Sequence, residues 1–235
     1  AYYRKVYEKF LPYINNNFDF AEMLSEMLGE LNASHTGCRY YGGTASLSTA
    51  ALGAFFDPNY EGDGLKIQEV IKRGPFAVKK NEVTAGCIIE KIDGEAIKAG
   101  EDYNALLDGK AGKNVRLTIR NTKGKTFDLT IKAISQSNQQ ELLYKRWVDR
   151  NRAIVDSVSK GRIAYVHVKA MNSESFRTVY SELLSDKNRN KDAVIVDERH
   201  NGGGWLHDDL CTLLSGKQYQ EFVPHGKVVG KDPFN

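Results

Sequence analysis

Three consecutive glycines, Gly202, Gly203 and Gly204, are the residues of this chain with the clearest chemical potential. They follow an apolar run at 193–196, whose lack of alternation predicts a strand that is covered on both faces. Such strands place ligand sites at their carboxyl ends, and glycines there let backbone N–H groups approach an anion. The anion is a phosphate or the oxyanion of an acyl-transfer reaction, and a plain flexible turn is the third interpretation.

The phosphate interpretation is weaker than the oxyanion interpretation. A Walker loop needs Gly-Lys-Ser/Thr after its spacer, and a dinucleotide fingerprint needs Gly-x-Gly-x-x-Gly. In this chain the three glycines are followed by Trp205, Leu206 and His207, so neither pattern is present.

The composition is that of an ordinary globular protein, with 41% hydrophobic and 27% charged residues among 235. The net charge of +3 comes from 33 basic and 30 acidic residues without a basic cluster, so nucleic acid is not an expected partner. The three cysteines, Cys38, Cys87 and Cys211, are far apart and odd in number. We therefore expect reduced thiols, with neither a disulfide framework nor a metal knuckle.

No apolar run reaches the roughly 20 residues that a bilayer span needs, and no signal segment opens the chain. The sequence begins at Ala1 without a methionine, inside an amphipathic stretch. We expect it to be a piece of a longer protein, from which a targeting peptide could have been lost.

The elements that must position these residues fall into three regions. In the first, apolar residues at three-and-four spacing predict helices over 2–14 and 20–31. Asp19 is the expected N-cap of the second helix, which should run out near Asn32. Gly37 is the expected stop signal.

The second region, residues 62–135, changes to short strands and turns. Two apolar runs within 86–97 surround an Asp-Gly pair, which predicts a tight hairpin. A brief helix is expected over 103–107. Period-two alternation then predicts half-exposed antiparallel strands over 114–120 and 126–131.

This order resembles a PDZ domain of the bacterial protease-associated type. The resemblance rests on Gly86-x-x-Ile89-x-x-Ile92-x-Gly94, on the helix with Leu106 and Leu107, and on the run Gly112–Ile119. Such domains capture peptide carboxyl termini by strand addition. The family's carboxylate-binding loop is expected near Arg73–Phe76, and peptide capture and a purely architectural role both stay open.

The third region predicts a layered α/β arrangement. A helix is expected over 141–158, a strand over 162–168 and a helix from 173 or 174 to 184, before the strand that leads to the glycines.

Taken together, the three regions resemble the tricorn-type serine peptidases, relatives of the carboxy-terminal-processing proteases. The matching motifs, besides the PDZ region, are Leu28–His35, Tyr144–Val148, Lys160–Val168 and Val196–Gly204. The resemblance implies a multidomain α+β chain. Its parts are a helical segment with a Ser-His pair (1–60), a PDZ-like, partly open β-barrel (61–137) and a truncated α/β peptidase domain of strand-helix-strand type (138–235).

The resemblance also assigns roles to single residues. His35 matches the general base, and Ser34 matches the neighbouring serine that helps to hold the catalytic network. Gly204 matches the oxyanion-hole position, while Gly202 and Gly203 shape its turn. The implied substrate is a peptide or an unfolded polypeptide, and no metal or organic cofactor is required. The site is expected to form only when the helical region docks on the α/β region.

In the family that the chain resembles, the nucleophilic serine follows the glycine turn after another strand. After Gly204 only Ser215 remains, at a predicted helix end, so the resemblance implies that the nucleophile lies beyond residue 235. We therefore expect the chain to be inactive alone and its parent to be a serine peptidase. The parent is expected to be homo-oligomeric and cytoplasmic, with a periplasmic or secreted location left open. The alternative function is that of a non-catalytic, PDZ-containing peptide-binding or scaffold protein.

Structural roles are favoured for the remaining histidines. His167 is expected to be half-buried in a strand, and His200 to stabilise the turn beside the glycines. His207, with two aspartates behind it, belongs to a helix start rather than to a metal site. His225 receives no role.

Overall fold

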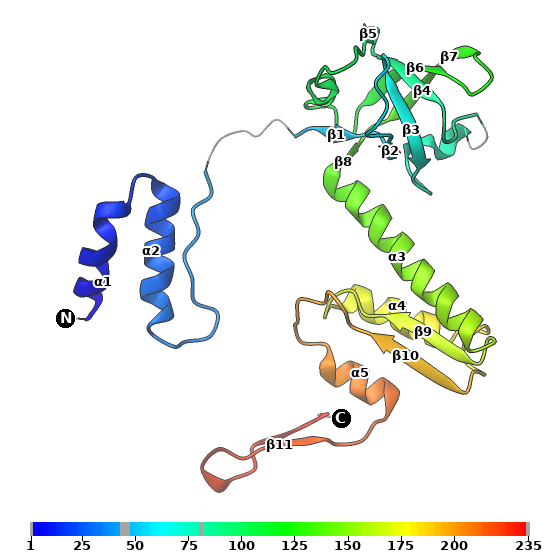
Figure 1. The fold of residues 1–235 in the computed structure, drawn as a ribbon. Coiled ribbons are helices and arrows are strands. Elements are labelled where there is room, and N and C mark those ends of the chain that lie inside the picture. Colours follow the sequence, from blue (N-terminus) through cyan, green and yellow to red (C-terminus); the bar gives the residue numbers. More distant parts are fainter. Residues whose placement is uncertain (1, 43–47, 80–81, 234–235) are drawn as a thin grey trace. The chain divides into compact units, whose positions relative to one another are not determined.

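The computed structural model describes residues 2–42, 48–79 and 82–233, and the chain divides into two compact units, Ala1–Leu47 and Ser48–Asn235 (Figure 1). The first unit contains α1 (Tyr2–Phe10), the 3-10 turn η1 (Leu11–Tyr13) and α2 (Asn17–Gly29). Ala21 and Met23 are its buried apolar residues among those described. The two predicted helices are thus present.

The N-cap of α2 is Asn16, and the prediction of Asp19 was wrong. The Asn16 side chain accepts hydrogen bonds from the backbone N–H groups of Phe18 and Asp19, at 2.8 and 3.0 Å. Asn16 can do so because its backbone is extended (φ −154°, ψ 174°), as a cap requires. Asp19 instead lies in the first turn, where its carboxylate accepts from the Asn15 backbone N–H at 3.0 Å and suits the helix dipole.

The helix also ends earlier than predicted, at Gly29 rather than near Asn32. Two tight turns follow, in which Leu31 N–H donates to the Leu28 carbonyl and Asn32 N–H donates to the Gly29 carbonyl. Asn32 then takes a left-handed backbone (φ 48°), which asparagine tolerates well. The helix therefore ends eight residues before Gly37, the predicted stop signal.

The second unit begins with an antiparallel, six-stranded PDZ-like sheet of order β2-β3-β4-β6-β7, in which β5 pairs with β4 (Figure 1). Its strands are β2 (Ala54–Phe56), β3 (Leu65–Val70), β4 (Ile88–Ile92), β5 (Glu95–Ala96), β6 (Asn114–Arg120) and β7 (Thr126–Lys132). The inward residues of β6, Val115, Leu117 and Ile119, are fully buried. The alternation over 114–120 therefore predicted the buried face of this strand correctly.

The predicted hairpin and short helix are confirmed. Asp93 and Gly94 both have positive φ angles (49° and 95°), which is the conformation of a tight hairpin turn between β4 and β5. The Asp93 carboxylate pairs with Lys110 and accepts the Arg116 backbone N–H at 2.8 Å, and these contacts lower its pKa. The short helix is η3 (Tyr103–Leu107).

A short pair, β1 (Ala50–Ala51) with β8 (Ile134–Ser135), leads from the sheet into α3 (Gln136–Val158). The helix η2 (Pro75–Lys79) lies between β3 and β4 in the chain. α3 begins five residues before the predicted start because the Ser135 hydroxyl caps it, accepting from the Asn138 backbone N–H at 3.1 Å. It packs against β9 (Ile163–His167).

The α/β part pairs β9 with β10 (Ala193–Asp197) in parallel, with α4 (Ser173–Leu183) between them in the chain and α5 (His207–Leu214) after them. Val166, Val168, Val179, Leu206 and Leu210 form its buried core. The parallel pair confirms the predicted strand-helix-strand pattern. A hairpin of β11 (Gln220–Phe222) and β12 (Gly230–Asp232), with the turn η4 (Pro224–Gly226), follows.

The expectation that the 193–197 strand is covered on both faces was wrong for the described residues. Val194 and Ile195 are 36% and 43% exposed, because the helices α3 and α4 pack on β9 and neither has comparable contact with β10. No helix in the part of the chain described here is both long and apolar enough to cross a membrane.

Candidate active site

Ser34 and His35 lie together in the turn that follows α2 in the first unit. The Ser34 Oγ and the His35 Nδ1 are 2.5 Å apart, and both residues are exposed. His35 has a left-handed backbone (φ 61°), and Thr36 Oγ1 donates to the Ala33 carbonyl at 3.0 Å beside it. Among the described residues His35 Nε2 has no hydrogen-bond partner, so this nitrogen is available for proton transfer when Nδ1 carries the ring proton.

The three glycines lie in the second unit, in the turn after β10. Asn201 holds this turn with both ends of its amide: Nδ2 donates to the Val168 carbonyl at 2.9 Å, and Oδ1 accepts from the Gly203 N–H at 2.8 Å. The Asn201 N–H donates to the Glu198 carbonyl at 3.1 Å. The end of β9 and the glycine turn are therefore tied together by one side chain.

Of the three glycines in this turn, Gly204 occupies the position that most strictly requires glycine. Its φ is +135°, and it forms an isolated parallel bridge with Met171. A Cβ on residue 204 would meet the Met171 Cβ at 2.7 Å and the Met171 carbonyl oxygen at 3.0 Å, whereas a Cβ on Gly202 would meet nothing within 4 Å. Glycine at 204 is needed for conformation and for space.

A buried carboxylate anchors the strand that leads to this turn. Asp197 accepts from Arg199 Nε at 2.9 and 3.0 Å, from Arg199 Nη2 at 2.5 Å and from the Tyr165 hydroxyl at 2.6 Å. The Arg199 guanidinium is the main cause that lowers the Asp197 pKa far below its ordinary value, and burial opposes it. In return, Asp197 raises the Arg199 pKa. The pair is fully charged at neutral pH.

Trp147 of α3 packs on this end of the two strands. The Arg199 guanidinium lies 4.9 Å from its ring centroid, and the His167 and His200 rings meet it edge-on at 5.3 and 5.2 Å. His200 has a left-handed backbone (φ 65°) at the turn. These contacts fit the turn-stabilising role that the sequence favoured for His200.

His167 is more buried than the half-buried residue that the sequence predicted, with 7% of its surface exposed. Its Nε2 is 2.5 Å from the Tyr144 hydroxyl. Burial lowers the His167 pKa, so the ring is neutral at neutral pH. A neutral, packed histidine of this kind belongs to the structure of the α3–β9 contact.

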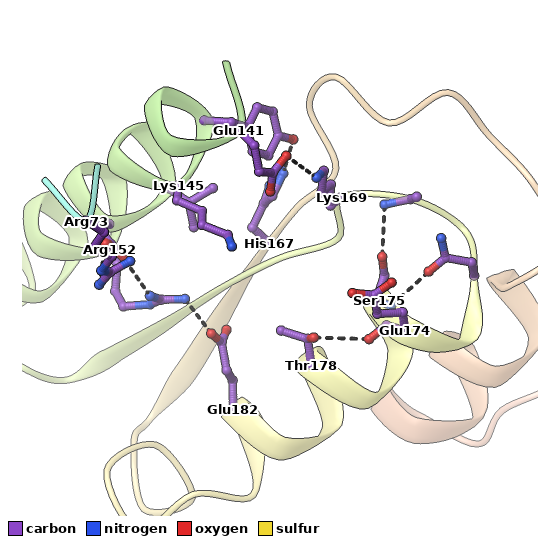
Figure 2. Close-up of a pocket in the computed structure, with 15 residues that line it drawn as sticks. Arg73, Glu141, Lys145, Arg152, His167, Lys169, Glu174, Ser175, Thr178 and Glu182 are labelled. Atoms are coloured by element: carbon purple, nitrogen blue, oxygen red, sulfur yellow. Dashed lines mark hydrogen bonds and ion pairs between the residues drawn. The ribbon is translucent and has the colours of Figure 1, made fainter. Parts of the chain in front are cut away.

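A cavity of about 460 Å³ lies between α3 and α4 (Figure 2). Figure 2 shows Lys145 reaching into it from α3, with Thr178 and Glu182 opposite on α4. Arg152 pairs with Glu182 at 2.7 Å across the cavity. Its lining contains none of the predicted catalytic residues.

The other candidates take structural positions. Ser215 ends α5 and donates its hydroxyl to the Cys211 carbonyl at 3.2 Å, as predicted for a helix end. His207 lies 3.6 Å from the Asp232 carboxylate, and His225 lies in η4. Across the described ranges no three His, Cys, Asp or Glu side chains come close enough to hold a metal ion.

The structure thus groups the predicted residues into two sets, Ser34 with His35 in the first unit and the three glycines in the second. Sequence reasoning missed the roles of Asn201 and Met171. The signal for Asn201 was its place directly before the glycines, since asparagine commonly bonds backbone groups of its own turn. Met171 carries no such local signal.

Comparison with known proteins decides the family. Residues 1–29 match the Tricorn protease C1 domain, residues 60–136 the Tricorn protease PDZ domain, and residues 162–233 Peptidase family S41. The chain belongs to the tricorn-type peptidases. It therefore contains a tricorn-like S41 serine peptidase region together with a PDZ domain.

Two relatives match nearly the whole chain. The Tricorn protease homolog of Saccharolobus solfataricus is 29% identical over 95% of this chain and 21% of the relative. The Tricorn protease of Thermoplasma acidophilum is 27% identical over 98% of this chain and 22% of the relative. The chain thus spans less than a quarter of the relatives' length.

A solved structure confirms the fold. The match with the crystal structure of the tricorn protease covers 98% of this chain and 23% of the tricorn protease chain, with a TM-score of 0.73 and 24% identity. The fold class is therefore mixed α+β, with N-terminal helices, a PDZ-like antiparallel sheet and a partial α/β layer.

Proposed function

We propose that this chain carries the general base and the oxyanion-hole turn of a serine peptidase that cleaves peptide bonds. The observation that supports this most is the contact of 2.5 Å between Ser34 Oγ and His35 Nδ1. A Ser34 hydroxyl that accepts a hydrogen bond from the Nδ1–H orients the ring and leaves Nε2 free to take a proton from a nucleophilic hydroxyl.

In the proposed reaction His35 Nε2 takes the proton from the nucleophilic serine as its oxygen attacks the peptide carbonyl. The negative charge that develops on the carbonyl oxygen is stabilised by the Gly204 N–H. His35 then returns the proton to the leaving amine, and the acyl-enzyme is hydrolysed by water in the same way. Gly202 and Gly203 give the turn its shape.

The nucleophile in this proposal follows residue 235 in the parent protein. Ser215 is unsuitable because its hydroxyl caps the end of α5, as a donor to the Cys211 carbonyl. We therefore expect the 235-residue chain alone to be inactive towards peptides. The domain boundaries at 60/61 and 137/138, the cytoplasmic location and the homo-oligomeric parent stay predictions.

The test is peptide hydrolysis by the full-length parent protein. His35→Ala should lower kcat/KM about 10²- to 10⁴-fold, the usual contribution of a general base. Ser34→Ala should cause a smaller loss, because the ring remains but its orientation is no longer fixed. His225→Gln is the matched control, since His225 lies in an exposed turn.

Equal hydrolysis by the parent protein and its His35→Ala variant would reject His35 as the base. Absence of any hydrolysis by the parent protein would favour the alternative, in which the PDZ region is the functional part of a peptide-binding or scaffold protein.

A further inference from the structure

A second, smaller pocket, of about 260 Å³, lies where the loop after β3 meets α3. Its described lining contains one carboxylate, that of Asp149, and five cationic side chains, those of Lys72, Arg73, Lys145, Arg146 and Arg150. Arg73 and Lys145 also line the cavity between α3 and α4 that Figure 2 shows. The sequence has no long basic run, so the fold creates this concentration of positive charge by bringing two short ones together. We call it the basic pocket.

Two of the five cations are already engaged by carboxylates. Asp149 lies 3.4 Å from Arg73, and it is shared with Arg152 outside the pocket, at 3.3 Å. Arg146 pairs with Glu69 near the end of β3. These ion pairs tie the PDZ region to α3, and they leave the single carboxylate of the lining with no capacity for the other cations.

The remaining three cations, Lys72, Lys145 and Arg150, have no ion-pair partner among the described residues. All three side chains are exposed, so they are free to turn towards a ligand. Arg146 and Arg150 stand four positions apart on α3, where like charges repel each other. A bound anion removes this repulsion and supplies the missing partners.

We propose that the basic pocket binds a short chain of phosphate groups, as an inorganic oligophosphate or as the end of a nucleotide. Such a chain concentrates enough negative charge to meet three unpaired cations at once. The guanidinium fork of Arg150 matches two phosphate oxygens, and the lysine ammonium groups act as point charges. The volume lies just below the roughly 300–1,000 Å³ of pockets that hold drug-sized ligands, which favours a compact polyanion.

An acidic peptide fits this pocket less well. The strand that leads into it, β3, lies between β2 and β4 in the sheet, so it is not an edge strand that could accept an added one. The opposite wall is α3, whose backbone groups bond within the helix. A peptide would therefore be held by its carboxylate side chains alone.

The test is titration calorimetry of the 235-residue chain with sodium triphosphate, without divalent cations, at an ionic strength of about 0.1 M. The Kd should be below about 1 mM. Lys145→Ala and Arg150→Ala should each weaken binding at least about threefold, and the double variant at least about tenfold. Raising the ionic strength to about 1 M, where the Debye length falls to about 3 Å, should weaken binding further.

Lys123→Ala is the matched control, because Lys123 is exposed in the turn between β6 and β7 and its loss changes the net charge equally. It should bind triphosphate like the wild type. The far-UV circular dichroism and the unfolding midpoint of each variant show whether it is folded. ATP that binds at least as tightly as triphosphate would identify a nucleotide as the source of the phosphates, and weaker binding of ATP would identify an inorganic chain.

The proposal would be overturned if the folded wild-type chain did not bind triphosphate, or if the pocket variants bound it as tightly as the wild type does. An equal loss in Lys123→Ala would show a diffuse charge effect instead of a pocket. Tighter binding of a hexaglutamate peptide than of triphosphate would assign the pocket to an acidic polypeptide. The inference goes beyond the proposed peptidase chemistry and does not depend on it, since the assay needs neither His35 nor a nucleophile.

Discussion

Gly204 lies so close to Met171 that a Cβ on residue 204 would stand 2.7 Å from the Met171 Cβ and 3.0 Å from its carbonyl oxygen. This contact, with the φ of +135°, fixes the path of the backbone through the proposed oxyanion-hole turn. The turn is therefore shaped before any substrate arrives, as electrostatic stabilisation of an oxyanion requires.

Gly204→Ala should destabilise the chain by about 1–3 kcal/mol, because alanine must adopt a strained backbone against Met171. Gly202→Ala should change the free energy of unfolding by less than about 1 kcal/mol, because a Cβ there meets nothing within 4 Å and no positive φ is required. Urea unfolding of both variants measures the difference. Equal destabilisation would show that the contact with Met171 is not what selects glycine.

Asn201 should control the rigidity of the glycine turn through its two amide contacts, to the Val168 carbonyl and to the Gly203 N–H. Asn201→Ala removes both and should raise hydrogen exchange of the amides at 202–205 at least about fivefold, which is the loss of roughly 1 kcal/mol of local stability. Asn201→Asp keeps the acceptor and loses the donor, so its exchange rates should lie between those of the wild type and those of Asn201→Ala. Unchanged protection in the alanine variant would mean that other contacts hold the turn.

Acid should weaken the α/β part through Asp197. Because Arg199 lowers the Asp197 pKa in the folded chain, the contribution of this carboxylate is present above the unfolded pKa of about 3.9 and is lost as the pH falls below that value. Asp197→Asn should cost about 2 kcal/mol at pH 7 and should flatten the loss of stability between pH 5 and pH 2. Urea unfolding across this range measures both.

Tyr165→Phe is a milder substitution than Asp197→Asn, since it removes only the hydroxyl that donates to Asp197 at 2.6 Å. It should leave most of the acid dependence in place. If Asp197→Asn and wild type lose stability in parallel below pH 5, Asp197 does not carry the acid dependence.

Features with local causes were predictable from the sequence. The Asp93-Gly94 turn demands two positive φ angles, which this residue pair supplies, and the alternation over 114–120 records which residues face the core. The Asn16 cap was missed because Asn16 and Asp19 are both good capping residues, and only the backbone conformation chooses between them.

Features with distant causes were not predictable. Gln139 meets Gly53 across 86 positions, and Asn201 meets Val168 across 33, with no local pattern that names the partner. The apolar run at 193–196 likewise indicates a preference for burial, but the elements that cover a strand are set by tertiary packing, which here places α3 and α4 on β9. The Ser34–His35 pair was assigned from family motifs, since two such residues at a helix end would otherwise indicate a cap.

The central claim, that His35 is the base and that the nucleophile follows residue 235, is tested most directly by labelling with a fluorophosphonate, which modifies activated serines. In the full-length parent protein the modified peptide identified by mass spectrometry should lie after residue 235, and His35→Ala should slow its modification about 10²-fold or more. The 235-residue chain should not be labelled above the level of its unfolded form. Labelling of Ser34, Ser215 or another serine within the chain, or a rate unaffected by His35→Ala, would contradict the account.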